Sequence, residues 1–166
     1  MRAMPILTIE AAESLLNILE DFLDKSEASF ALIIERGGAI LAQQGEIPPS
    51  IDPTIVAALA AGSFAATREL ALRVGEAEFS ALHQQGKEHQ ILMSAVNEDA
   101  VLVTVFGART TLGLVRFYSV RTVKRIAAIL DQARGQSQLP IDLGDDVLDD
   151  SCEVFDEQAG GVGRKS

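Results

Sequence analysis

Few residues in this chain have types and spacings that suit chemistry. His83 and His89 flank a predicted turn, but a metal site needs further ligands, so we interpret them as surface histidines on neighbouring strands. The segment GARTTLG at 107–113 is similar to a phosphate-binding loop but lacks the lysine that such a loop uses. We interpret it as a tight connection into a helix, with Thr110 or Thr111 as the capping residue.

Two arginines and the single cysteine are the remaining candidates. Arg109 and Arg116 have two interpretations: arginines that reach a partner's phosphate, or solvated and structural side chains. Cys152 lies among acidic residues, and negative charge disfavours its thiolate, so we expect no redox chemistry there. The sequence therefore predicts no catalytic residue, no cofactor and no metal site, and the chain is not expected to be an enzyme.

Composition and charge separate a folded domain from a tail. The chain has 166 residues, of which 48% are hydrophobic, as is typical of one globular domain. Its net charge of -10 argues against nucleic acid as a partner, because phosphate binding relies on Lys and Arg. From Gly135 onward eight acidic residues face only Arg164 and Lys165. We therefore predict a folded domain over 1–134 and an acidic, flexible C-terminal tail over 135–166.

Localisation follows from what the sequence lacks. Its most apolar segment has an uncharged run of 15 residues, 53–67, shorter than the roughly 18 that a membrane span needs. No signal-peptide pattern is visible at the N-terminus, and a lone cysteine excludes an intramolecular disulfide. These observations favour a cytoplasmic protein without a membrane span.

The segment from Asp52 to Gly75 predicts the central helix. Asp52 caps its first turn, Pro53 suits the first helical position, and Gly75 suits a left-handed stop. Between these positions the residues are apolar nearly all round, and a helix of this kind must be covered on more than one side. A single sheet covers only part of such a helix, so the rest needs a partner.

The two sides of this helix carry different residues. We expect Ile55, Leu59 and Leu70 to pack on the protein's own sheet. The alanine side then remains for a second copy of the chain, with a charged edge for a further partner. The predicted dimer and partner interface consists of Ala57, Ala58, Ala61, Gly62, Ala65, Arg68, Glu69 and Leu72.

The remaining elements predict an antiparallel sheet between helices. Apolar runs separated by turn residues indicate hairpins, and runs without alternation indicate strands buried on both faces. Such strands need helices on both faces of the sheet, so we place the first and last helices on one face and the central helix on the other. The expected ranges are helix 8–25, strands 30–35, 39–43, 79–85, 90–96 and 101–106, and helix 112–134.

Four blocks resemble the roadblock/dynein light chain family. They are AALAAG at 57–62, GEAEF at 75–79, VLVTVF at 101–106 and RTTLGLVR at 109–116, within a similarity that covers about residues 8–134. The resemblance implies an α+β domain of order α-β-β-α-β-β-β-α, with a five-stranded antiparallel sheet in a profilin-like three-layer arrangement. It also implies a homodimer in which central helices pack together and the edge strands at 79–85 join two sheets.

The resemblance, strongest to bacterial polarity proteins of the family, further implies a partner. This is a Ras-like small GTPase, bound one per dimer, whose GTP hydrolysis the dimer stimulates by repositioning the GTPase's own switch regions. The alternative is a dimeric scaffold that binds a GTPase or a polarity protein without changing turnover. The segment 139–155 resembles the family's acidic C-terminal end. The candidates for a second GTPase contact are its apolar residues Leu143, Val147, Leu148 and Phe155. The alternative interpretation is a tail that only increases solubility.

Overall fold

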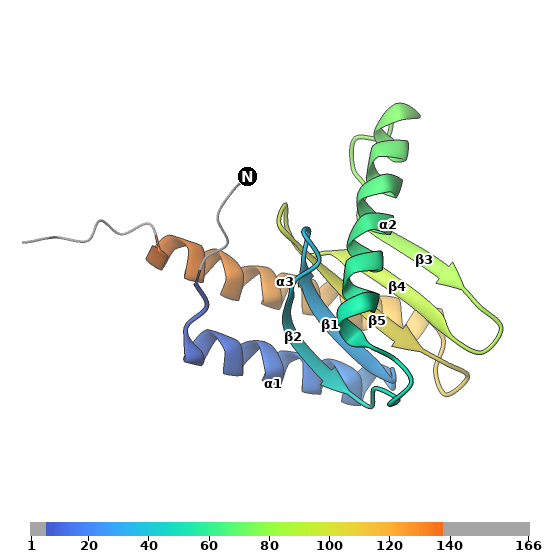
Figure 1. Ribbon diagram of the computed structural model, residues 1–166, viewed down its shortest axis with the longest axis horizontal. Coiled ribbons are helices and arrows are strands. Elements are labelled where there is room, and N and C mark those ends of the chain that lie inside the picture. Colours follow the sequence, from blue (N-terminus) through green and yellow to red (C-terminus); the bar gives the residue numbers. More distant parts are fainter. Residues whose placement is uncertain (1–5, 138–166) are drawn as a thin grey trace, which may run out of the picture.

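The computed structural model of the chain describes residues 6–137 (Figure 1). Thr8 caps the first helix by accepting a hydrogen bond from the Ala11 backbone N–H at 3.1 Å, and Asp52 caps the second through the Thr54 N–H at 2.9 Å. In chain order the elements are α1 (Ile9–Ser26), β1 (Phe30–Glu35), β2 (Ile40–Gly45), α2 (Pro53–Arg73), β3 (Ala81–Gln85), β4 (Gln90–Ala95), β5 (Ala100–Phe106) and α3 (Leu112–Ser137).

The five strands form one antiparallel sheet in the order β2-β1-β5-β4-β3. β5 is central, and all seven of its residues are buried, as the nearly continuous apolar run at 101–106 predicts. β3 lies at one edge and β2 at the other, and both carry more exposed residues than the strands between them.

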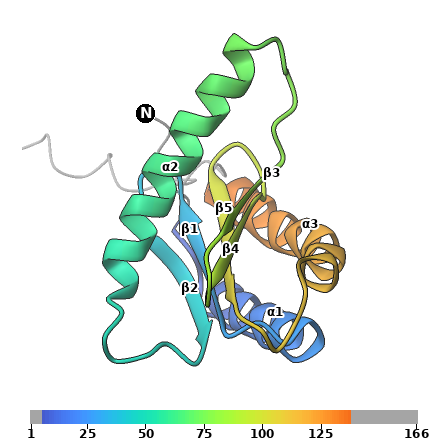
Figure 2. The same ribbon diagram turned by 90° about the vertical axis from the view of Figure 1, so that its right-hand side faces the viewer.

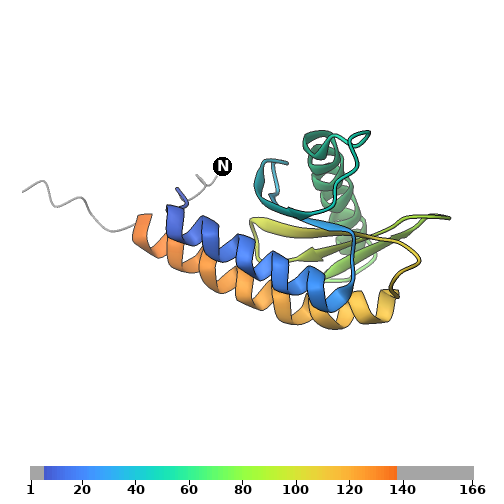
Figure 3. The ribbon, with the colours of Figure 1, turned by 90° about the horizontal axis from the view of Figure 1, so that it is seen from below.

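Two helices cover one face of the sheet. α1 and α3 run antiparallel beneath it (Figure 3), where Leu19 and Phe22 of α1 and Ile126 of α3 belong to one buried cluster. The Arg125 guanidinium also donates to the Asp21 carboxylate at 2.7 Å and ties the two helices together at their surface. The expected pairing of the first and last helices is therefore confirmed.

One helix, α2, lies on the opposite face (Figure 2). Its small residues pack against the sheet together with Phe64, and the helix continues past the edge of the strands at its C-terminal half (Figure 2). The buried cluster on this face includes Leu32 and Ile34 of β1 and Val101 and Val103 of β5. The three-layer α+β architecture predicted from the sequence is thus confirmed.

Some boundaries differ from the expected ones. β3 begins at Ala81, two residues after the predicted start, and β2 extends to Gly45. α3 continues to Ser137, three residues beyond the predicted domain end at Arg134. Thr111 makes the predicted cap, since its hydroxyl accepts a hydrogen bond from the Leu114 backbone N–H at 3.3 Å.

Candidate interaction surface

α2 presents an apolar stripe that points away from the sheet. The stripe consists of Ile55, Leu59, Gly62, Ala66 and Leu70, spaced by three or four residues so that they fall on one side of the helix. Ile55, Leu59 and Leu70 are 58%, 69% and 63% exposed. We call this set the outer stripe; it is a continuous apolar surface with small residues at its centre.

The outer stripe corrects the predicted orientation of the helix. The sequence analysis assigned Ile55, Leu59 and Leu70 to the sheet, but they face outward. Ala57 and Ala61, assigned to a partner, are only 0% and 6% exposed and pack on the protein's own sheet. Neither side chain is therefore available to a partner while the domain stays folded.

The β1–β2 turn approaches the backbone of α2 closely. A Cβ on Gly38 would lie 3.1 Å from the Ala58 Cα atom, so the turn and the helix backbone are nearly in contact. Gly38 also has φ +97°, a conformation that suits glycine. At this contact Ala57 lies on the sheet side of the helix and Leu59 on the open side.

The other predicted interface residues remain exposed. Ala58, Gly62, Ala65, Arg68, Glu69 and Leu72 all lie on the accessible surface of α2. The Glu69 carboxylate accepts a hydrogen bond from the Arg73 Nε at 2.9 Å, one turn later. Gly62 belongs to the outer stripe, and the other five line the flank of α2 beside it; their role in binding stays a prediction.

By length and composition alone, α2 is also the one helix within residues 6–137 that qualifies as a membrane span. These two properties are weak evidence, because an apolar helix of a globular domain shares them. Four of its side chains, from Ala57 to Phe64, pack on the sheet, and Arg68, Glu69 and Arg73 occupy its last turns. We therefore interpret the outer stripe as a surface for protein contact.

A pocket opens between α2 and the end of β1. It has a volume of about 240 Å³, and two guanidinium groups line it, from Arg36 after β1 and from Arg68 on α2. Ala61, Phe64 and Val101 supply apolar walls. We call this site the arginine pocket; the sequence analysis missed Arg36, whose position beside α2 depends on the turn of the hairpin.

The arginine pocket concentrates positive charge. Burial lowers the pKa of the Arg36 guanidinium, the charge of Arg68 lowers it further, and Glu98 acts in the opposite direction. The Arg36 Nε is buried and has no hydrogen-bond partner within the described part of the chain. The Nη2 atom of Arg36 donates to the Asn97 carbonyl oxygen at 3.2 Å, which fixes the side chain against the β4–β5 turn.

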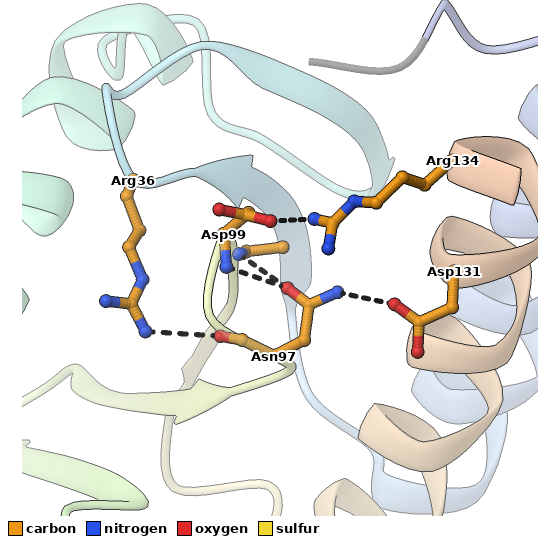
Figure 4. A network of polar contacts seen from close by, with 6 residues as sticks. Arg36, Asn97, Asp99, Asp131 and Arg134 are labelled. Atoms are coloured by element: carbon orange, nitrogen blue, oxygen red, sulfur yellow. Dashed lines mark hydrogen bonds and ion pairs between the residues drawn. The ribbon is translucent and has the colours of Figure 1, made fainter. Parts of the chain in front are cut away.

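A polar network continues from this turn to the end of α3 (Figure 4). The Asn97 side-chain oxygen accepts from the backbone N–H groups of Asp99 and Ala100, each at 2.9 Å, and its amide donates to Asp131 at 3.3 Å. The Asp99 carboxylate forms an ion pair with Arg134. The network joins the last turns of α3 to the turns at one end of the sheet.

The residues considered for chemistry lie apart from the arginine pocket. His83 on β3 forms a 2.8 Å hydrogen bond with Gln90 on β4, and His89 is exposed. Within residues 6–137 no group of three potential ligands is placed to hold a metal ion. Arg109 and Arg116 are exposed, and Arg109 lines a shallow hollow of about 920 Å³ at the opposite end of the sheet.

The predicted tail contacts lie outside the described residues. They are Leu143, Val147, Leu148 and Phe155, together with the lone Cys152.

The fold and this surface define a class of protein. The chain forms a three-layer α+β domain with one helix alone on a sheet face and an exposed apolar stripe along the outside of that helix, a feature that often marks a protein interface. The Roadblock/LC7 domain family matches residues 15–106, and the chain belongs to this family of regulatory domains.

Solved structures support the assignment over more of the chain. The gliding protein MglB of Thermus thermophilus is 30% identical and has a TM-score of 0.74, over 80% of this chain and 99% of that one. Myxococcus xanthus MglB is 26% identical, with a TM-score of 0.71 over 77% of this chain and 96% of its own. An uncharacterised protein of Methanocaldococcus jannaschii is 28% identical over 108 residues, which are 64% of this chain and 92% of that protein. The chain is thus similar to the MglB proteins of these two bacteria.

Proposed function

We propose that this protein is a cytoplasmic homodimer that regulates a Ras-like small GTPase and stimulates its GTP hydrolysis. The observation that carries the proposal is the outer stripe of α2, in a chain that is similar to MglB over 80% of its length. One protein named MglB is described in a tetrameric arrangement, which supports self-association in this group.

The outer stripe suits contact with an identical helix. Gly62 and Ala66 are small enough to let two helix backbones approach closely, while Leu59 and Leu70 supply apolar area on either side. Burying a leucine of this kind contributes roughly 1.5–3 kcal/mol. In a two-fold symmetric contact each of these residues is buried once on each of the two chains. A short stripe therefore suffices for a stable dimer.

The GTPase contact is assigned to the charged flank of α2. Arg68 and Glu69 lie beside the outer stripe and stay exposed when the stripe is covered. The dimer is proposed to act on the switch regions of one bound GTPase without supplying a catalytic residue of its own. Leu143, Val147, Leu148 and Phe155 remain the candidates for a second contact with that GTPase.

Single-turnover GTP hydrolysis tests this function. A purified Ras-like GTPase from the same genome, loaded with GTP, is mixed with increasing amounts of the full-length protein. We expect the hydrolysis rate to rise to a plateau, and Leu59→Asp, which disrupts the stripe, to remove the increase. Val120→Asp is the matched control, since Val120 is 52% exposed on α3 at the other face.

A dimeric scaffold is the alternative, and the same proteins distinguish it. A GTPase that is retained by the immobilised protein in a pull-down, yet hydrolyses GTP at its intrinsic rate under saturation, supports the scaffold and overturns activation. Absence of both retention and acceleration, tested across the Ras-like GTPases of the genome, would refute both functions.

A further inference from the structure

We propose that the arginine pocket is a docking site for an acidic segment of this same chain, residues 145–155 (DDVLDDSCEVF). The segment's carboxylates would pair with Arg36 and Arg68, and its apolar residues would cover the adjacent flank of α2. This contact needs no GTPase, and because it uses Arg68, Val147, Leu148 and Phe155, it excludes the GTPase contacts proposed for these residues while the segment is docked.

The first argument is the excess of positive charge in the pocket. Arg36 and Arg68 line the same 240 Å³ space, and the carboxylate among the lining residues, Glu69, is engaged by Arg73 at 2.9 Å. Glu98 offsets part of the charge on Arg36 from outside this lining. The buried Arg36 Nε nevertheless has no hydrogen-bond partner within the described residues. Two neighbouring guanidiniums with an open donor favour carboxylate ligands.

The second argument is the match between apolar surfaces. Ala61, Phe64 and Val101 form the pocket walls, and Leu72 at its rim is 50% exposed. The acidic segment alternates its carboxylates with large apolar residues, which charge pairing alone does not require. These residues are Val147, Leu148, Val154 and Phe155.

The third argument is the path of the chain. α3 ends at Ser137, and Arg134 in its last turns forms an ion pair with Asp99. The Asp99 carbonyl oxygen in turn accepts the Arg36 backbone N–H at 2.9 Å, so the end of α3 is tied to the turn that carries Arg36. Asp149 lies twelve residues after Ser137, a tether that spans up to ~40 Å when extended. A short tether also gives the segment a high effective concentration at the pocket.

The chain carries its own probe for this contact. Cys152 is the single cysteine and lies inside the segment, so a nitroxide attached to it marks the segment without mutation. In ¹⁵N-labelled full-length protein at low salt, we expect the nitroxide to broaden the amide signals of residues 61–72 of α2. The amides of residues 9–19 of α1, on the opposite face, should keep their intensity, and 0.5 M salt should restore the α2 signals.

Two double variants distinguish binding in the arginine pocket from nonspecific electrostatic attraction between the acidic segment and the basic residues of the domain. Arg36→Gln with Arg68→Gln should reduce the paramagnetic relaxation at α2 at least fivefold. Arg116→Gln with Lys124→Gln removes the same charge from exposed positions on α3 and should leave it unchanged. Equal relaxation in α2 and α1, or equal relaxation in the two double variants, would overturn the proposal. Dispersed amide spectra establish that each variant is folded.

An untagged measurement guards against effects of the nitroxide. Replacing Asp145, Asp146, Asp149 and Asp150 by Asn in the full chain should shift the amide signals of residues 61–72 and of Arg36. Identical spectra would contradict docking. A mixture of tagged ¹⁴N protein and untagged ¹⁵N protein reports only contacts between molecules. If the α2 signals broaden in this mixture as much as in the tagged ¹⁵N protein, the segment of another copy occupies the pocket, and the proposal is overturned.

Discussion

The backbone N–H of Arg36 donates to the Asp99 carbonyl oxygen at 2.9 Å, and the side chain of that Asp99 pairs with Arg134 (Figure 4). A single residue therefore connects the turn beneath α2 with the last turns of α3. The two side chains of the ion pair are only 24% and 31% exposed, so solvent screens it less than a surface pair.

Arg134→Met should therefore destabilise the domain. The change leaves the half-buried Asp99 carboxylate without its cation, and lost hydrogen bonds to charged groups cost about 1.5–3 kcal/mol. Chemical denaturation of the full-length protein measures the loss. Arg116→Met, at an exposed position of the same helix, is the control, and equal stabilities for the two variants would contradict a role for the pair.

Leu59→Asp should convert the proposed dimer into a folded monomer. Leu59 is 69% exposed in the single chain, so the substitution costs the domain little, while a carboxylate in a helix–helix contact loses hydration without gaining a partner. Multi-angle light scattering gives the mass, with Val120→Asp as the control that stays dimeric. Wild-type protein that is monomeric, or that sediments with liposomes, would show that the stripe serves another purpose.

Ala57→Leu should lower stability without changing the outer stripe. Ala57 is fully buried where α2 crosses the sheet, and overpacking of such a site costs about 1–3 kcal/mol. Ala128→Leu, at an exposed position of α3, has a similar helix propensity and should be nearly neutral. Thermal unfolding compares the two. An equal Tm for both variants would contradict the burial of the alanine face.

Gly38→Ala should be far more damaging than Gly37→Ala. Gly38 combines φ +97° with a built Cβ position 3.1 Å from the Ala58 Cα, whereas a Cβ at Gly37 would meet only the flexible end of Glu35 at 3.4 Å. Left-handed backbone alone costs a non-glycine residue about 1–2 kcal/mol. Urea unfolding should resolve the difference, and similar midpoints for the two variants would argue against the close contact between turn and helix.

The ion pairs of Asp21 predict a stability change at acid pH. Hydrogen bonds from Lys25 and then from Arg125 hold the pKa of the Asp21 carboxyl below its ordinary value. Its contribution is therefore complete above the unfolded-state pKa of about 4 and is lost as the pH falls through the lower folded-state pKa. Asp21→Asn should flatten the decline of unfolding free energy below pH 5. Curves that stay parallel to wild type down to pH 2 would refute the assignment.

Strand and helix ranges were predictable because their local signals agree with the tertiary structure. The nearly continuous apolar run at 101–106 predicts a central strand, and Asp52 with Pro53 marks the start of α2. The resemblance to the roadblock family added the strand count and the expectation of a dimer.

The orientation of α2 was not predictable from its own residues. A helix that is apolar on every side has no contrast that assigns one face to the core, and the usual preference for burying leucine over alanine gave the wrong face. The orientation depends on contacts with distant parts of the chain, such as the close approach of Gly38 in the β1–β2 turn to the backbone of Ala58, 20 residues later. The arginine pocket was missed for the same reason, since Arg36 and Arg68 meet only through that turn.

The central position of β5 has a consequence for synthesis on the ribosome. β5 pairs with β1 on one side and β4 on the other, so the inner edge of the first hairpin has no strand to bind until Ala100 has been made. Glu35 precedes its partner Ala100 by 65 residues, or about 3–13 s at ordinary translation rates. During that interval the nascent chain exposes an open strand edge and an α2 with no complete sheet to cover it, two surfaces that favour aggregation.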